Sequence, residues 1–360
     1  MSPLRSGPSP DYGLWAAAGC LVLLSAIGMV SAASTVDPQL AVRHVLWILA
    51  GIVLSWTIAR TDYRRWTDVA WVGYGLSLCI LALVPVAGAM RLGATRWLSI
   101  FGFSVQPSEI MKVTTICLLA RYLSDQPTPL PPRALMISLA ITVPPTLLIF
   151  LQPDLGSASV FCAIWLAVVW VAGMSPRLLA GLAGMVLALL PIGWHLLKDY
   201  QRDRLLVFIN PDADPLGAGY TIIQSKIAIG SGRLWGRGWF AGTQNQLSFL
   251  PERHSDFVFS VIGEEWGFLG SAAIVALFAL LLSRALRIAM ATSDPQGRLL
   301  ITGSCAWLGY QAFVNMGMVM GLLPVVGVPL PLVSYGGTSM AMVWMTLGLL
   351  QSVRRSDASL

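Results

Sequence analysis

Ten predominantly apolar stretches, most of them about 20 residues long, constrain the fold of this chain more than any other feature. A helix that crosses the hydrocarbon core of a bilayer needs roughly 20 such residues. Only 11% of the residues are charged, and a soluble domain, with about 25%, has far more to cover its surface. We therefore predict an all-α polytopic membrane protein, whose ten transmembrane helices occupy residues 12–34, 40–60, 66–89, 106–124, 134–151, 155–174, 177–196, 257–286, 297–322 and 332–353.

The distribution of arginines predicts how these spans are oriented. Twelve arginines lie in short segments on the side of the N-terminus, and three lie in short connections on the opposite side. Because basic residues concentrate on the cytoplasmic side, we predict that both termini are cytoplasmic. The predicted organisation is a tail at 1–11, a single ten-helix membrane domain at 12–353 and a tail at 354–360. The segment 197–256, between the seventh and eighth spans, is then a large extracytoplasmic loop. The net charge is +6. Because most of the basic residues lie in short loops between apolar runs, we attribute this charge to membrane orientation, and we expect membrane lipids as partners and no nucleic acid.

Polar side chains gather on the predicted outer side. Arg96 and Gln106 precede the fourth span, and Glu109 and Lys112 lie in its first turns. Glu109 and Lys112 share one helix face because their spacing is i, i+3. They form either a structural ion pair or a polar wall for an anionic or sugar ligand. Asp154, in a short outer connection, belongs either to a simple turn or to the same wall.

Two further polar stretches lie on this side. In the 197–256 loop, Arg204 and Lys226 stand near glycines. Such residues can offer charge and backbone N–H groups to a phosphate, or they can form a tightly folded loop. Ser334 lies among small residues at the outer start of the last span, and these either pack closely against other helices or line a ligand path.

Asp256 closes the outer loop, directly before an apolar helix. A carboxylate in this place is commonly a helix cap, and at the boundary of water and lipid it can also act as a general base. A glycoside hydrolase needs two carboxylates about 5–9.5 Å apart. Asp256 and Glu264 would lie about 12 Å apart along a helix, and Glu252 would lie about 6 Å from Asp256 only in a helical segment. Transfer from a sugar pyrophosphate needs one base, and cations or a metal that hold the departing charge. The sequence favours this second chemistry.

These stretches together resemble the SEDS family, the RodA/FtsW polymerases of bacterial peptidoglycan. The resemblance extends over about 240 residues and rests on short motifs in a fixed order. The residues Pro251-Glu252-Arg253-His254 and the short tails look more like RodA than FtsW. The motifs are Arg96-Trp97, Gln106-Pro107-Ser108-Glu109 with Lys112, Gln152-Pro153-Asp154-Leu155-Gly156, Gly217-Ala218-Gly219-Tyr220, Gly230-Ser231-Gly232, Phe249-Leu250-Pro251-Glu252, Ser255-Asp256-Phe257, Gly263-Glu264-Glu265 and Pro331-Leu332-Val333-Ser334-Tyr335-Gly336-Gly337.

The resemblance implies a glycosyltransferase that polymerises lipid II into glycan strands at the outer face of the bacterial cytoplasmic membrane, for cell elongation and rod shape. It implies inversion at the donor sugar and release of undecaprenyl pyrophosphate. The family's essential loop aspartate corresponds to Asp256. A class B penicillin-binding protein is the implied partner, and a divalent cation, Mg or Mn, is the implied cofactor, with no organic cofactor. We expect the substrate to contact Lys112, Glu109, Arg96, Gln106, Asp154, Arg204, Lys226 and Ser334.

Three alternatives stay open at this point. Ten spans with charged residues inside them also suit a lipid II flippase or another transporter. A division-specific polymerase of the FtsW type would share the same motifs. A scaffold that recruits cell-wall enzymes would need no catalytic residue. The absence of a visible internal repeat and the clustering of polar groups on one face favour chemistry over transport.

Overall fold

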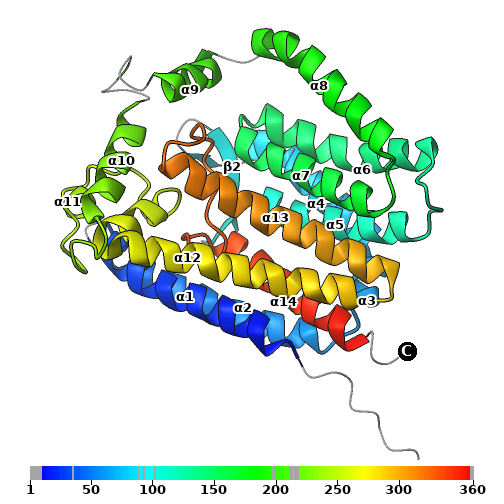
Figure 1. The fold of residues 1–360 in the computed structure, drawn as a ribbon, viewed down its shortest axis with the longest axis horizontal. Helices are drawn as coiled ribbons and strands as arrows, with labels where there is room; N and C mark the ends of the chain where they lie inside the picture. The colour runs from blue at the N-terminus through cyan, green and yellow to red at the C-terminus, as the bar shows by residue number, and fades with distance from the viewer. Residues whose placement is uncertain are drawn as a thin grey trace, which may run out of the picture.

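The computed structural model describes residues 10–34, 36–87, 89–91, 94–100, 103–196, 199–210, 214 and 219–356. Helices dominate these residues, and a small sheet interrupts them (Figure 1). The helices are α1 Tyr12–Ala33, α2 Gln39–Ala59, α3 Tyr63–Asp68, α4 Ala70–Ala87, α5 Pro107–Ser124, α6 Pro132–Leu151, α7 Leu155–Val171, α8 Pro176–Leu196, α9 Asp199–Ile209, α10 Tyr220–Gly232, α11 Thr243–Gln246, α12 Val258–Ala291, α13 Pro295–Val319 and α14 Gly337–Ser356.

Each of the ten predicted spans corresponds to a helix: α1, α2, α4, α5, α6, α7, α8, α12, α13 and α14. Within the described ranges, four of these, α1, α2, α6 and α12, are long and apolar enough to cross a membrane by length and composition. The boundary of the last span was predicted wrongly, because α14 begins at Gly337 and not at 332. Pro331 and the positive φ of Leu332, 62°, keep the preceding residues out of a helix.

The segment between α4 and α5 also differs from the all-α prediction. It forms an antiparallel sheet in the order β1-β2-β3, with β1 Ala89–Arg91, β2 Ala94–Ile100 and β3 Phe103–Val105. Leu98 of β2 pairs with Val105 of β3. Strands of 3, 7 and 3 residues lack the length that the apolar-run criterion detects.

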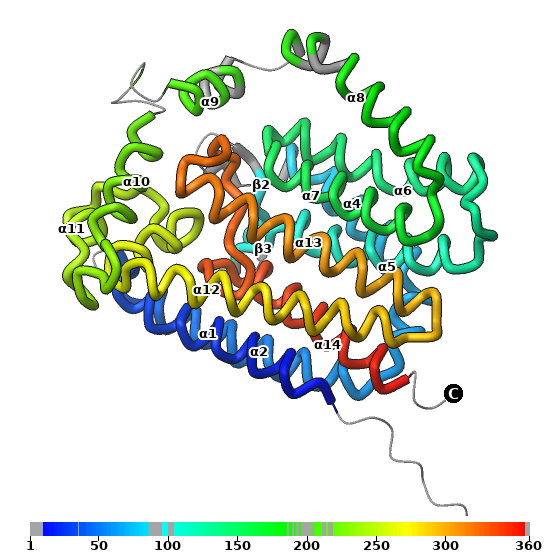
Figure 2. Tube along the Cα trace, viewed as in Figure 1, coloured from blue at the N-terminus to red at the C-terminus, as the bar shows by residue number. Residues whose placement is uncertain are grey.

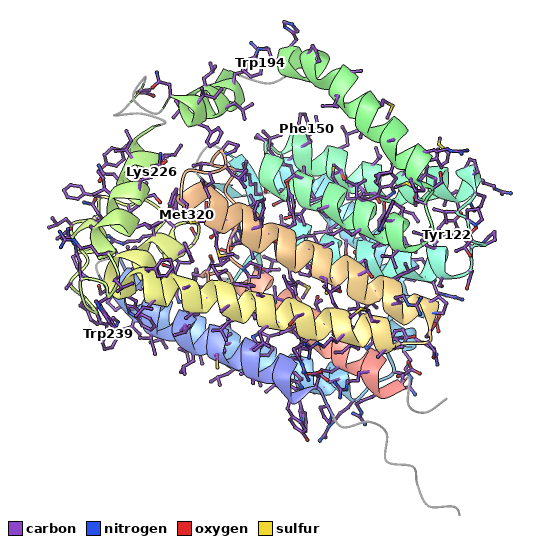
Figure 3. All side chains as sticks on the ribbon, in the orientation of Figure 1. Tyr122, Phe150, Trp194, Lys226, Trp239 and Met320 are labelled. Atoms are coloured by element: carbon purple, nitrogen blue, oxygen red, sulfur yellow. The ribbon has the colours of Figure 1, made fainter. Side chains whose placement is uncertain are left out.

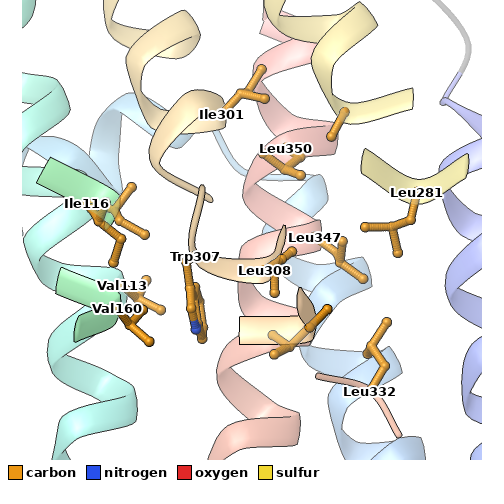
Figure 4. Close-up of a cluster of buried hydrophobic side chains, with 14 of the residues drawn as sticks. Val113, Ile116, Val160, Leu281, Ile301, Trp307, Leu308, Leu332, Leu347 and Leu350 are labelled. Atoms are coloured by element: carbon orange, nitrogen blue, oxygen red, sulfur yellow. The ribbon is translucent and has the colours of Figure 1, made fainter. Parts of the chain in front are cut away.

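The core is centred on α5 and α13. Helix α13 packs against α5, α7 and α12. Figure 4 shows its Trp307 on the side of Val113 of α5 and Val160 of α7, and its Leu308 near Leu347 of α14. The central position explains how α5 can carry Glu109 and Lys112 inside the bundle, since its polar groups face other helices and not lipid. Helices α8 and α9, by contrast, run along the edge of the molecule (Figure 2).

Asp11, directly before α1, contacts α12 and α14 at one end of the helix bundle. Its carboxylate accepts hydrogen bonds from Arg284 at 3.0 and 2.9 Å and from Arg354 at 2.5 Å, and its backbone N–H donates to Gln351 Oε1 at 2.9 Å. Burial alone would raise the pKa of Asp11, but the hydrogen bond from Arg284, the backbone N–H of Leu14 and the two arginine charges outweigh it, and the pKa is lowered. The start of α1 therefore lies beside the ends of α12 and α14.

A break in α12 anchors the segment that precedes this helix. Gly267 has φ 65° and ψ −156°, which interrupts the helix. The segment 233–238 satisfies the backbone groups that the break releases. Arg237 N–H donates to the carbonyl of Glu264 at 3.0 Å, and Phe268 N–H donates to the carbonyl of Arg233 at 2.8 Å. The beginning of α12 is thereby fixed to the loop that leads toward residue 256.

Candidate active site

Asp256 lies in a tight turn at the start of α12. The N–H groups of Ser255, Asp256 and Phe257 all donate to the carbonyl of Glu252, at 3.1, 3.1 and 3.3 Å. Glu252 itself has a positive φ of 48°. The turn leaves Asp256 half-buried and places it directly before the helix. The backbone conformation of Asp256 is thus set by this turn and by the helix that follows it.

The loop between α13 and α14 holds the same turn from the other side. Ser334 Oγ donates to the carbonyl of Ser255 at 2.5 Å, and Tyr335 N–H donates to the carbonyl of His254 at 2.9 Å. The Asp256 carboxylate lies beside Gly327, since a Cβ built at that glycine would stand 3.4 Å from Oδ2. The structure therefore brings together Asp256 and Ser334, two of the predicted site residues.

His254 neighbours this turn and packs edge-on against the ring of Tyr335, with 5.9 Å between ring centroids. Burial lowers the pKa of His254 below its ordinary value of 6.5, although the nearby Glu252 carboxylate acts in the opposite direction. The imidazole is therefore neutral at pH 7 and adds no positive charge to the turn that carries Asp256.

A second cluster contains four predicted site residues. Lys112 donates to Glu109 Oε1 at 2.5 Å, and both side chains are 1% exposed. Arg96 lies 3.7 Å from Asp154 Oδ2 and also donates to the carbonyl of Gln152 at 3.4 Å. Asp154 attracts the Lys112 ammonium as well, so two cations and two anions adjoin. In their ionised forms these two cations and two anions balance one another within the cluster.

Helix α13 connects the two clusters through residues that sequence reasoning missed. Gln311 Oε1 accepts from Lys112 at 3.0 Å, and its Nε2 donates to the carbonyl of Pro329 at 2.8 Å. Asn315, one turn further along, donates to the carbonyl of Asp256 at 3.0 Å. The signal was available, because two amides at i, i+4 inside a predicted span share one helix face.

The remaining predicted residues lie around these clusters. The backbone N–H of Gln106, at the start of α5, donates to Thr338 Oγ1 at 3.2 Å. Lys226 of α10 is exposed, and its aliphatic chain lies against Gly321 at the end of α13; Figure 3 shows it near Met320. Arg204 belongs to α9, and its side chain lies outside the described part of the structure, as do Gly217 and Ala218 of the predicted loop motif.

Glu264 and Glu265, two adjacent carboxylates of α12, bind other segments of the protein. Glu264 accepts from the backbone N–H groups of Gln244 at 3.0 Å and Asn245 at 3.3 Å. Glu265 accepts from Ser31 Oγ at 2.5 Å and from Asn245 Nδ2 at 3.1 Å. Both carboxylates thus hold the segment around Gln244 and Asn245 against α1 and α12. Glu264 is committed to these contacts and is a poor partner for Asp256 in a two-carboxylate mechanism.

The described side chains do not form a metal site by themselves. Among the residues that the structure describes, no three His, Cys, Asp or Glu side chains lie close enough together to hold an ion.

Comparison with known proteins adds to this geometry. The family description "Cell cycle protein", covering FtsW, RodA and SpoVE, matches residues 12–359. The peptidoglycan glycosyltransferase MrdB of Escherichia coli (strain K12) is 42% identical over 336 residues, which cover 92% of this chain and 90% of that protein.

Two solved structures are also similar. A chain from a study titled "Structural coordination of polymerization and crosslinking by a peptidoglycan synthase complex" matches with a TM-score of 0.84 and 34% identity. The rod shape determining protein RodA of Thermus thermophilus matches with a TM-score of 0.73 and 31% identity. Each match covers 97% of this chain and 98% of the other.

Proposed function

This chain belongs to the FtsW, RodA and SpoVE family of cell cycle proteins, and we propose that it is a peptidoglycan glycosyltransferase that polymerises lipid II for cell elongation and rod shape. The observation that carries the proposal is the position of Asp256. Its half-buried carboxylate projects from a turn that α12, α13 and the 327–335 loop hold together.

The proposed reaction needs one general base. Asp256 accepts the proton of the acceptor sugar's 4-hydroxyl, and the oxygen attacks the anomeric carbon of the donor. A new glycosidic C–O bond forms as the bond between that carbon and the pyrophosphate oxygen breaks, with inversion. Undecaprenyl pyrophosphate leaves with the bonding electrons and needs no general acid.

The cations have unequal roles in this proposal. Arg96 is partly exposed and can turn a guanidinium N–H group toward a pyrophosphate oxygen. Lys112 is enclosed by Glu109, Gln311 and the ring of Trp307. Its charge therefore acts on the pyrophosphate at a distance, with these side chains in between. Lys226 and Arg204 would supply further positive charge, while Gln106 and Ser334 shape the site.

The membrane orientation is part of the proposal. The protein is a multi-pass protein of the inner membrane, with both termini in the cytoplasm and Asp256 outside. The twelve-to-three distribution of arginines supports this orientation. The contacts of Asp11 with Arg354 support it too, since they bring the start of α1 and the end of α14 to one end of the bundle.

The proposed partner is a class B penicillin-binding protein, which would crosslink the strands. The similarity to a chain from a complex that coordinates polymerization and crosslinking supports this partner. A requirement for Mg or Mn stays a prediction of the family resemblance, and no organic cofactor is proposed.

A polymerisation assay tests the proposed function and separates it from transport. Fluorescent lipid II is added to the detergent-solubilised protein with its partner, and the products are resolved by length. Glycan ladders from the wild type support the polymerase. Absence of ladders, together with movement of lipid II across vesicle membranes, would identify a flippase.

A further inference from the structure

Asn315 is a fully buried amide, 0% exposed, near the outer end of α13. Its Nδ2 group donates to the carbonyl of Asp256 at 3.0 Å and to the carbonyl of Val328 at 2.7 Å. These acceptors belong to two segments, the turn before α12 and the loop after α13. One amide group therefore joins the two segments.

Both segments determine where the Asp256 carboxylate lies. The first carries the carboxylate. The second contains Gly327, which precedes Val328, has a φ of 70° and lies beside Asp256 Oδ2. The positive φ is a conformation that glycine adopts readily. Asn315 thus holds both the backbone from which the carboxylate projects and the glycine turn beside it.

The other half of the amide offsets part of the stability that these two hydrogen bonds contribute. Asn315 Oδ1 is buried and has no hydrogen-bond partner among the residues that the structure describes. A buried polar atom without a partner costs about 1–3 kcal/mol. An apolar side chain of similar size would avoid this cost, so the presence of the amide is explained by its two donated hydrogen bonds.

We propose that Asn315 is a positioning residue for Asp256. The inference rests on the proposed function, in which Asp256 is the base. Asn315 does not touch the sugars; its hydrogen bonds keep the carboxylate where the acceptor hydroxyl can reach it. A displacement of about 1 Å at a reacting group can cost about a hundredfold in rate.

The test compares two substitutions of Asn315 with a control. Asn315→Leu removes both donated hydrogen bonds, and Asn315→Asp keeps the size of the side chain while replacing the amide donor. The control is Gln351→Leu, which removes a buried amide that pairs with the backbone of Asp11 at the other end of the bundle. For each protein, kcat, KM, the pH profile of kcat and the melting temperature are measured with lipid II and the partner protein.

We expect kcat to fall about 10- to 100-fold in both Asn315 variants, while KM changes by no more than about twofold. The pH profile should also shift, because the kcat profile reports groups in the substrate complex. The control should lose melting temperature and keep both kcat and its pH profile. If Asn315→Leu does not fold, Asn315→Asp decides the question.

Two results would overturn the inference. One is a folded Asn315 variant with the kcat and pH profile of the wild type. The other is an equal loss of kcat in the Gln351 control, since that loss would be a general effect of destabilisation. Failure of the wild type to polymerise lipid II would contradict the proposed function itself, and the inference with it.

Discussion

Replacing Lys112 by methionine should destabilise the protein strongly. The side chains of Lys112 and Glu109 are each 1% exposed and lie 2.5 Å apart, so Lys112→Met leaves a carboxylate buried without its nearest cation. Removal of one partner of a buried ion pair costs about 3–5 kcal/mol. At 1.4 kcal/mol per factor of ten, this is about a hundredfold to several thousandfold in the folding equilibrium. Thermal unfolding in detergent should show a clear drop in melting temperature.

The double variant Glu109→Gln/Lys112→Met separates folding from chemistry. It removes both charges, and Gln311 Oε1 still accepts from Trp307 Nε1 at 2.7 Å. We expect most of the lost stability to return, because an uncharged pair avoids the cost of a single buried ion. We expect polymerisation to stay impaired, because the proposed role at the pyrophosphate requires the positive charge of Lys112.

The assay measures unfolding and lipid II polymerisation on the same preparations of the wild type, both single variants and the double variant. A single Lys112→Met variant as stable as the wild type would refute the reasoning on burial. Full polymerisation by the double variant would show that the pair is structural, and would remove both residues from the substrate-binding site.

Three further predictions concern the contacts of Asp11, the contacts of Arg96 and the cation that the family resemblance implies. Asp11→Asn should lower stability at pH 7 by about 1–3 kcal/mol, measured by thermal unfolding, because hydrogen bonds from Arg284 and Arg354 to a charged acceptor are lost. The pKa of Asp11 is lowered in the folded protein, so this stabilisation is fully present above its ordinary value of 3.8 and is lost as the pH falls from there through the lower pKa of the folded state; a difference that does not shrink as the pH is lowered over this range would contradict this. Arg96→Lys keeps the charge but loses the planar fork and its bond to the carbonyl of Gln152, and should lower kcat/KM for lipid II about tenfold, whereas unchanged kinetics would exclude a contact. Chelation by EDTA should abolish polymerisation and added Mg or Mn should restore it; full activity in EDTA would refute the cation requirement.

Local sequence signals predicted several features well. The apolar runs indicated the positions of the long helices, and the i, i+3 spacing predicted the contact between Glu109 and Lys112. The position of Asp256 directly before an apolar run matched the start of α12. These features depend on residues close together in the chain, which periodicity and composition report.

The features that escaped prediction depend on residues far apart in the chain. Lys112 and Gln311 are 199 positions apart, and no local pattern states that their helices pack together. Similarly, the bond from Asn315 to the carbonyl of Asp256 requires the tertiary arrangement of α12 and α13. The break at Gly267 was also missed, because the apolar pattern continues through it.

Polymerisation of purified lipid II by the wild type and Asp256→Asn, side by side with the same partner protein, tests the central claim most directly. The substitution keeps the size of the side chain and removes the base. We predict that the Asn variant folds with the melting behaviour of the wild type and produces no glycan strands. Glycan strands formed at the wild-type rate would contradict the assignment of Asp256 as the catalytic base.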